Sequence, residues 1–243
     1  MEVLVVGNTA YVDDDFCAKA FPGDHVKVVA AQEARRDESS PHASWKELLQ
    51  HLEQAYEFDR VVYLSNYLTP HTDTVGDIEL LRSVFRTCAG RRVQLLYVAG
   101  PAGAEGAADA AGRTGKGIIA HAANDLCRYY AAREGVQTKI LRVPFLYTAS
   151  AALEDPFLVP MFDACSTGSA ALQGAQDAAF PLLCAEELSV LVRRIFDSWN
   201  GNFETLNVAD TFHHTVGEVG DALQALFPGL SVAYGDSAGY ALP

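Results

Sequence analysis

The sequence predicts an α/β protein with a doubly wound parallel β-sheet. Short apolar runs alternate with amphipathic helical patterns from the N-terminus to Tyr147, and this alternation is typical of βα units. The chain has 243 residues, of which 49% are hydrophobic, so it can bury its own core without disulfides or a metal. After Tyr147 the alternation is less regular. We therefore predict one Rossmann-like domain over residues 1–243, in which residues 148–243 contribute a C-terminal lobe.

The strands before Tyr147 are predicted from apolar runs that end at turn residues. They lie at residues 2–6, 25–30, 60–64, 93–98 and 138–143. The intervening helices are predicted from caps and from apolar residues spaced three or four apart. They comprise a short helix before Pro22, one that begins at a Ser44 capping box, and helices at 77–88 and 117–134.

The C-terminal part contains fewer recognisable elements. Residues 186–199 have the pattern of a helix, and residues 205–208 that of a short strand. Thr215 and Glu218 form a capping box that begins a last helix, which ends near Phe227.

The charge balance excludes several classes of partner. The chain has 18 Lys and Arg against 31 Asp and Glu, a net charge of −13. Nucleic acids and anionic membranes bind basic surfaces, so we expect neither as a partner. No apolar segment approaches the length of a membrane-spanning helix.

The cysteines and histidines give no sign of a metal site or of disulfides. The five cysteines lie far apart and form no CxxC pair, which predicts reduced thiols in a cytoplasmic protein. His213 and His214 are adjacent, but no third ligand lies nearby in the sequence, so no metal is predicted.

Four segments, in this order, resemble those of a known family. They are Asp73–Leu81 (family pattern Asn-Val-x-Gly-Thr), Arg142–Tyr147 (Arg-Pro-x-x-x-Tyr), Phe180–Leu188 (Phe-x-x-Val-x-Asp-Val) and Leu206–Val208 (Tyr-Asn-Leu). Over most of residues 1–227 the chain resembles the extended short-chain dehydrogenases/reductases (SDRs), the NAD-dependent epimerase/dehydratase family. The resemblance implies NAD or NADP as cofactor, a nucleotide-sugar substrate and a Ser/Thr–Tyr–Lys catalytic arrangement. It also implies a C-terminal lobe on the substrate side, which we expect to be abbreviated here because family members usually have a longer one.

The segment expected to bind the cofactor departs from the family pattern. The family has Gly-x-x-Gly-x-x-Gly after the first strand, and these glycines let a pyrophosphate reach backbone N–H groups at a helix N-terminus. Here only the first glycine is present, as Gly7, and Asp13 stands at the third position. By position, the candidate cofactor contacts are Gly7, Asn8, Ala10 and Tyr11.

Acidic residues follow directly, as Asp13, Asp14 and Asp15. Carboxylates favour the positive end of a helix, where they compete with a diphosphate, so we expect this helix start to be occupied by its own acids. The second strand ends at Ala30, where NAD enzymes have an acidic residue for the ribose. Arg35 and Arg36 are candidate contacts for the 2′-phosphate of NADP, and the alternative is that they belong to a solvated charged loop.

The catalytic positions implied by the resemblance are all changed. The family's Lys aligns with His121 and its Tyr with Gly117, and no Tyr-x-x-x-Lys occurs in the chain. His121 and Asp125 stand four apart, so they share a helix face and form a candidate acid/base pair; the alternative is a polar pair beside the cleft. Tyr147 ends a strand and is a further candidate, although the matching family Tyr is largely structural.

These departures leave three functions open. The chain is a catalytically degenerate binding or companion subunit of an active paralogue, an SDR-fold isomerase, lyase or reductase with a rebuilt site, or an unusual NAD(P)-dependent epimerase or reductase. We favour the first, because all three catalytic positions and two fingerprint glycines are changed. The resemblance also implies a homo- or hetero-oligomer with an SDR-type subunit through helices 77–88 and 117–134.

Overall fold

The computed structural model describes residues 1–7, 11–30, 57–65, 74–100, 115–148, 158–172, 174–180, 182–208 and 214–235. Its centre is a sheet of six strands, all paired in parallel, in the order β10-β5-β4-β3-β1-β2. The strands are β1 (Glu2–Gly7), β2 (His25–Ala30), β3 (Arg60–Leu64), β4 (Gln94–Ala99), β5 (Gln137–Arg142) and β10 (Phe203–Asn207). The predicted Rossmann-like parallel sheet is thereby confirmed.

The strand order reverses between β1 and β3. From β1 the chain forms β2 at one edge of the sheet and then returns past β1 to form β3 on its other side. Ligands of doubly wound sheets bind at such a switch point, beside the carboxyl ends of the strands. In this protein those ends are Gly7 and Leu64, which are neighbours in the register.

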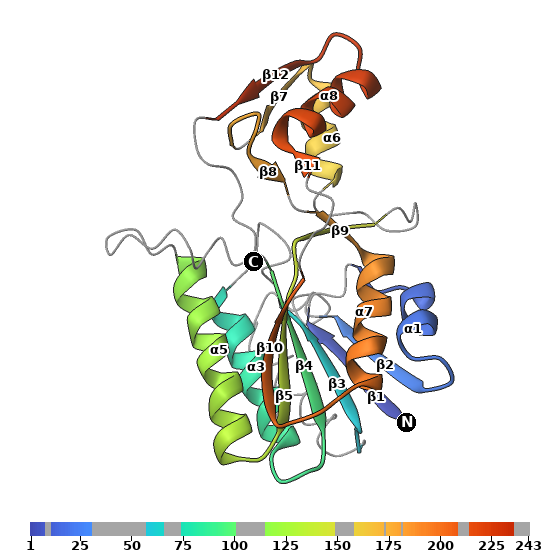
Figure 1. Cartoon of the computed structure of the whole chain (residues 1–243), viewed down its shortest axis with the longest axis vertical. Helices are drawn as coiled ribbons and strands as arrows, with labels where there is room; N and C mark the ends of the chain where they lie inside the picture. Colours follow the sequence, from blue (N-terminus) through green and yellow to red (C-terminus); the bar gives the residue numbers. More distant parts are fainter. Residues whose placement is uncertain are drawn as a thin grey trace, which may run out of the picture.

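Helices cover both faces of the sheet (Figure 1). Helices α3 (Thr74–Cys88) and α5 (Gly115–Arg133) lie on one face, and α1 (Asp14–Ala20) and α7 (Ala185–Asp197) on the other. Successive side chains of β1 alternate between two cores, as in any strand: Leu4 packs on the α3/α5 side and Val3 on the α1/α7 side. This two-sided burial explains why the strands read as continuous apolar runs.

Part of the C-terminal region forms a small lobe beyond the carboxyl ends of the strands (Figure 1). It contains α6 (Leu158–Ser166), β7 (Ser169–Leu172), β8 (Ala179–Phe180), β11 (His214–Thr215), α8 (Val216–Leu226) and β12 (Ser231–Tyr234). A three-residue pair, β6 (Phe145–Tyr147) with β9 (Leu182–Cys184), lies between this lobe and the sheet. After β9 the chain returns to the sheet as α7 and β10, so residues 148–243 contribute to both parts.

The predicted elements agree with the observed ones to within a few residues. Helix α3 begins three residues before the predicted residue 77, and α5 begins two residues before 117. The Thr215 capping box is confirmed, because Thr215 N donates to Glu218 Oε2 over 2.9 Å and Glu218 N donates to Thr215 Oγ1 over 3.1 Å. The helix predicted at Ser44 lies outside the described residues. None of the described helices has the length and hydrophobicity of a membrane span.

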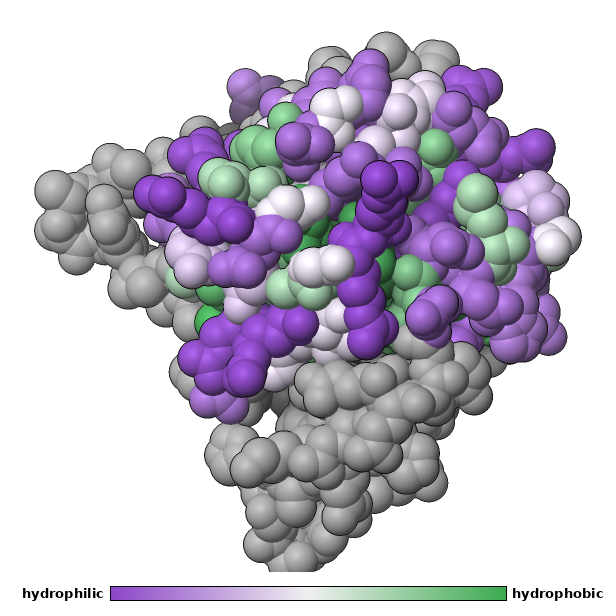
Figure 2. Space-filling model, turned by 90° about the horizontal axis from the view of Figure 1, so that it is seen from below, coloured by the Kyte–Doolittle hydropathy of each residue, from purple (hydrophilic) through white to green (hydrophobic). Residues whose placement is uncertain are grey.

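Seen from the amino ends of the strands, the visible surface is mostly hydrophilic, with small hydrophobic areas between the polar side chains (Figure 2). This is the edge opposite the switch point. The search for a site therefore concentrates on the carboxyl edge.

Candidate functional site

Gly7 ends β1 at the switch point in a conformation that only glycine adopts readily. Its φ is +109°, and a Cβ at this position would overlap the carbonyl oxygen of Leu64 in the neighbouring strand. The first residue of the fingerprint is thus required by the close approach of β1 to β3. This requirement applies whether or not a cofactor binds.

The start of helix α1, which follows β1, is capped by its own acid. Phe16 N donates to Asp13 Oδ1 over 2.8 Å, and Cys17 N donates to the Asp13 carbonyl over 3.0 Å. Asp14 and Asp15 lie in the first turn, and Asp15 forms an ion pair with Lys19 at 2.5 Å. At least one N–H of the helix start that would bind a pyrophosphate in a Rossmann fold, that of Phe16, is therefore bound by a carboxylate of the same chain.

The space beside this helix start is almost closed. A cavity of about 10 Å³ lies between the starts of α1 and α7 and is lined by Tyr11, Asp13, Asp15, Phe16, Thr148, Ala185 and Glu186. Such a volume is the least that one water molecule needs. Three of the lining residues are carboxylates, so the cavity is both too small and too acidic for a diphosphate.

Tyr11, a candidate cofactor contact, is part of the core. Its side chain is 1% exposed and packs in the hydrophobic cluster on the α1/α7 side. The other candidates, Asn8, Ala10, Arg35 and Arg36, lie outside the described residues. Their roles therefore stay predictions.

Tyr147 lies beside a thiol and two carboxylates. The β6–β9 register places it opposite Cys184, whose Sγ donates to Glu186 Oε2. Burial, then Cys184, then Glu187 and Glu186 raise the pKa of the Tyr147 phenol. Burial and the hydrogen bond to Glu186 likewise raise the pKa of the Cys184 thiol. Both groups are therefore protonated at neutral pH, which disfavours Tyr147 as a phenolate base.

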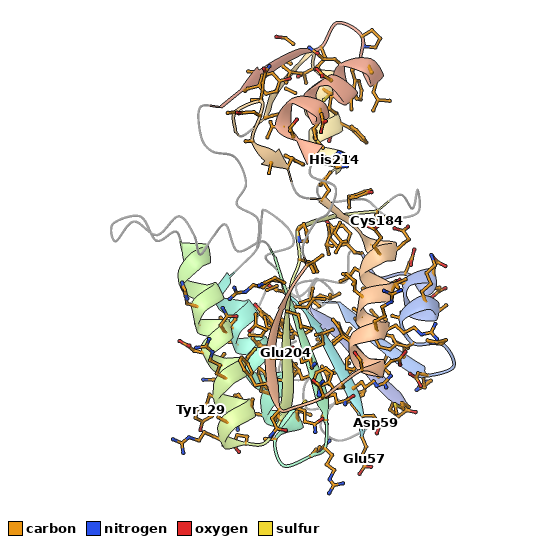
Figure 3. The ribbon with its side chains drawn as sticks, viewed as in Figure 1. Glu57, Asp59, Tyr129, Cys184, Glu204 and His214 are labelled. Carbon is orange, nitrogen blue, oxygen red and sulfur yellow. The ribbon has the colours of Figure 1, made fainter. Side chains whose placement is uncertain are left out.

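The sequence did not single out Cys184 or Glu186. Figure 3 shows Cys184 where α7 begins, at the upper end of the helix. A signal was present, because Cys184 directly precedes two acidic residues at a predicted helix start. The pairing with Tyr147, which gives these residues their interest, is non-local and leaves no such signal.

His121 and Asp125 lie on the exposed side of α5. The side of this helix that packs on the sheet instead carries Ala123, Cys127 and Tyr130. The structure thus places the candidate acid/base pair on α5 and Tyr147 on β6, on separate elements. In the described ranges, no three metal-ligating side chains converge.

Comparisons with known proteins relate the chain to nucleotide-sugar enzymes by structure. No protein-family model matches the sequence, and no curated protein is similar to it at a significant level. UDP-glucuronic acid 4-epimerase from Bacillus cereus, solved with NAD, has a TM-score of 0.70 at 12% identity, over 98% of this chain and 87% of that one.

Two further solved structures are similar to the same degree. The NAD-dependent NDP-hexosamine 5,6-dehydratase TunA has a TM-score of 0.68 at 12% identity, over 99% of this chain and 86% of that one. UDP-glucose 4-epimerase from Thermotoga maritima has a TM-score of 0.69 at 14% identity, over 100% of this chain and 90% of that one. The chain therefore has the fold of the NAD-dependent epimerase/dehydratase enzymes of the SDR type.

Proposed function

We propose that this protein is a catalytically degenerate SDR-like subunit that binds a partner in the cytoplasm, as the companion of an active paralogue. The observation that carries the proposal is the carboxylate of Asp13, which caps α1 where an SDR cofactor would place its pyrophosphate. The absence of the Tyr-x-x-x-Lys pattern from the sequence supports it independently. The five free cysteines are consistent with a reducing compartment.

Electrostatics oppose a dinucleotide at this position. Asp13, Asp15 and Glu186 line the same small cavity, and a diphosphate there would add further negative charge. Two like charges 4 Å apart repel by about 4 kcal/mol at an effective dielectric constant near 20. The repulsion from three carboxylates exceeds what one helix start contributes to anion binding, about 0.3–1 kcal/mol.

The chemistry of the remaining candidates supports the same proposal. A Tyr acts as a base only when its pKa approaches the working pH, whereas burial and Cys184 raise the pKa of Tyr147. His121 and Asp125 are exposed, so they lack the dry surroundings that strengthen acid/base pairs in active sites.

The partner surface that we propose is the outer side of α3 and α5, which pack against each other. Tyr129 on α5 is 53% exposed, although it is a large aromatic residue. It makes an edge contact with Tyr130, which stacks on Phe85 of α3 at 4.7 Å between ring centroids. An SDR-type subunit, of the same or another chain, would cover this surface.

Cofactor titration tests the proposal directly. We expect no saturable binding of NAD⁺, NADH, NADP⁺ or NADPH at millimolar concentration, measured by calorimetry and by the shift in melting temperature. A micromolar dissociation constant for any of them would overturn the degenerate role. An active SDR with an intact fingerprint, titrated in the same buffer, is the positive control.

The second candidate is an unusual NAD(P)-dependent nucleotide-sugar epimerase or reductase. The similar folds of enzymes solved with NAD favour it. It requires cofactor binding together with turnover of a UDP-sugar, measured by chromatography of the sugar nucleotides and, for a reductase, by the loss of NAD(P)H fluorescence. Turnover that is lost in Tyr147→Phe would support this candidate against the companion role.

A further inference from the structure

Strand β10 lies at one end of the six-stranded sheet. Figure 1 shows it at the near edge of the sheet, and within the described residues only β5 pairs with it. Thr138 N donates to the Asn202 carbonyl over 2.8 Å, and Val208 N donates to the Arg142 carbonyl over 2.9 Å. Because backbone N–H and C=O groups alternate in direction along a strand, those of the even-numbered residues of β10 point toward β5. The N–H and C=O groups of Phe203, Thr205 and Asn207 therefore point outward.

This edge lacks the features by which proteins normally prevent pairing. Edge strands are protected by lysine, proline or bulges, but β10 reads Phe-Glu-Thr-Leu-Asn and pairs with β5 without a bulge. Its one charge, on Glu204, is bound by Lys139 Nζ at 2.5 Å. Figure 3 shows Glu204 on this strand. No described strand pairs with the outer edge of β10, so this edge can pair with another strand.

We propose that the partner on this edge is β10 of a second copy of this chain, antiparallel about a two-fold axis at Thr205. That register places Phe203 opposite Asn207, and Thr205 opposite Thr205. Phe203, Thr205 and Asn207 point their backbone groups outward, which is the arrangement of hydrogen-bonded pairs in an antiparallel ladder. Glu204 then faces Leu206 rather than another Glu204, so no like charges stand opposite each other.

A groove beside the strand extends the contact beyond the backbone. It has a volume of about 460 Å³ and is lined by Arg128, Ala131, Ala132, Asn202 and Phe203. The guanidinium of Arg128 lies 5.9 Å from the centre of the Phe203 ring. The proposed register brings Asn207 of the second copy next to Phe203, where its amide can accept from Arg128. The two alanines leave room for this approach.

The proposal goes beyond the companion role, since it concerns the edge of the sheet and not the outer side of α3 and α5. The two surfaces are also testable separately. Pairing through β10 gives one continuous sheet across two copies. This pairing depends on backbone N–H groups and not on particular side chains.

Thr205→Pro and Thr205→Val are the matched variants. Proline removes an N–H that points away from β5, a position that edge strands tolerate, so the ladder with β5 stays intact. We expect the mass from light scattering to fall by half in Thr205→Pro and to stay at the wild-type value in Thr205→Val. An equal mass for the folded Thr205→Pro protein and the wild type overturns the proposal.

Hydrogen exchange of the wild type keeps the test independent of how well the proline variant folds. The amides of Thr205 and Asn207 should exchange about tenfold more slowly at high than at low protein concentration, since only pairing protects them. Those of Glu204 and Leu206, which face β5, should not respond. Fast exchange of Thr205 at every concentration contradicts the proposal. Tyr129→Glu, a charge on the outer side of α5, should leave the exchange at Thr205 unchanged.

Discussion

The amino ends and the carboxyl ends of the strands, which form the amino edge and the carboxyl edge of the sheet, use charge in opposite ways. At the amino edge, cations are bound into the structure: Arg60 lies 5.1 Å from the Phe196 ring, Phe196 stacks on Trp199, and Lys139 lies 5.3 Å from the Trp199 ring. At the carboxyl edge, carboxylates and protonated groups line the small cavity between the starts of α1 and α7 and the surroundings of Tyr147. Two basic residues of an acidic chain, Arg60 and Lys139, thus pack on aromatic rings at the amino edge.

This contrast separates the contacts that stabilise the sheet from those that occupy the candidate site. The Arg60–Phe196–Trp199–Lys139 stack joins β3, the end of α7 and β5. It depends on the sheet alone and requires no ligand. The start of α1 depends on Asp13 in the same way. At each edge, the contacts described are made by residues of this chain.

Phe196→Ala should have the largest effect, because it breaks the amino-edge stack at its centre. Phe196 is 3% exposed and also contacts Phe21, with ring centroids 6.0 Å apart. Burial of a phenyl group on this scale predicts a loss of about 3–5 kcal/mol in the free energy of unfolding, measured by urea denaturation.

Phe162→Ala is the matched control. Phe162 lies in the small lobe, is 38% exposed and contacts Phe227. We expect a loss of less than about 1.5 kcal/mol. Equal losses in the two variants would contradict the central place of Phe196.

Gly7→Ala, at the carboxyl edge, should cause the next largest loss in the free energy of unfolding. The alanine combines a φ of +109° with the overlap of its Cβ and the Leu64 carbonyl, for a cost of about 3 kcal/mol. Gly23→Ala has a φ of +80° but no atom within 4 Å of its Cβ, so it should cost only about 1 kcal/mol. Thermal and urea unfolding of both variants measures the difference. A loss at Gly7 no larger than at Gly23 would remove the steric reason for this glycine.

The sequence predicted the parts of this fold that depend on local patterns. The apolar run at residues 61–64 identified β3, and the Thr215–Glu218 spacing identified the start of α8. The acids at residues 13–15 likewise indicated a helix that caps itself. The short pair of β6 with β9 was not predicted, because three residues show no periodicity. The surroundings of Tyr147 were missed for the same reason.

Asp13→Ala tests the self-capped helix at the carboxyl edge. Loss of the acceptor for Phe16 N should destabilise the protein by about 1 kcal/mol, whereas Asp13→Ser keeps a capping oxygen and should cost less than half of that. Circular dichroism during urea unfolding measures both. An Asp13→Ala protein with the same free energy of unfolding as the wild type would mean that the cap does not contribute to stability.

The smallest effect concerns two thiols, one at each edge. At the carboxyl edge, burial and the hydrogen bond to Glu186 raise the pKa of Cys184. At the amino end of the sheet, burial alone raises the pKa of Cys88 from 9.0 to about 12. A thiol whose folded pKa is raised stays protonated after the unfolded chain has lost its proton. The unfolded state therefore binds fewer protons between pH 9 and 12, and stability falls as the pH rises.

Cys88→Ala isolates this contribution from other groups that titrate at high pH. The alanine lowers stability at every pH by its cavity, but it removes the thiol's share of the pH dependence. Between pH 7.5 and 9.5 the wild type should lose about 0.8 kcal/mol more than the variant, as calculated for one thiol that ionises only when unfolded. Urea midpoints at the two pH values give this difference. Equal losses of stability in both proteins would mean that Cys88 ionises in the folded state, which would contradict the raised pKa of its thiol.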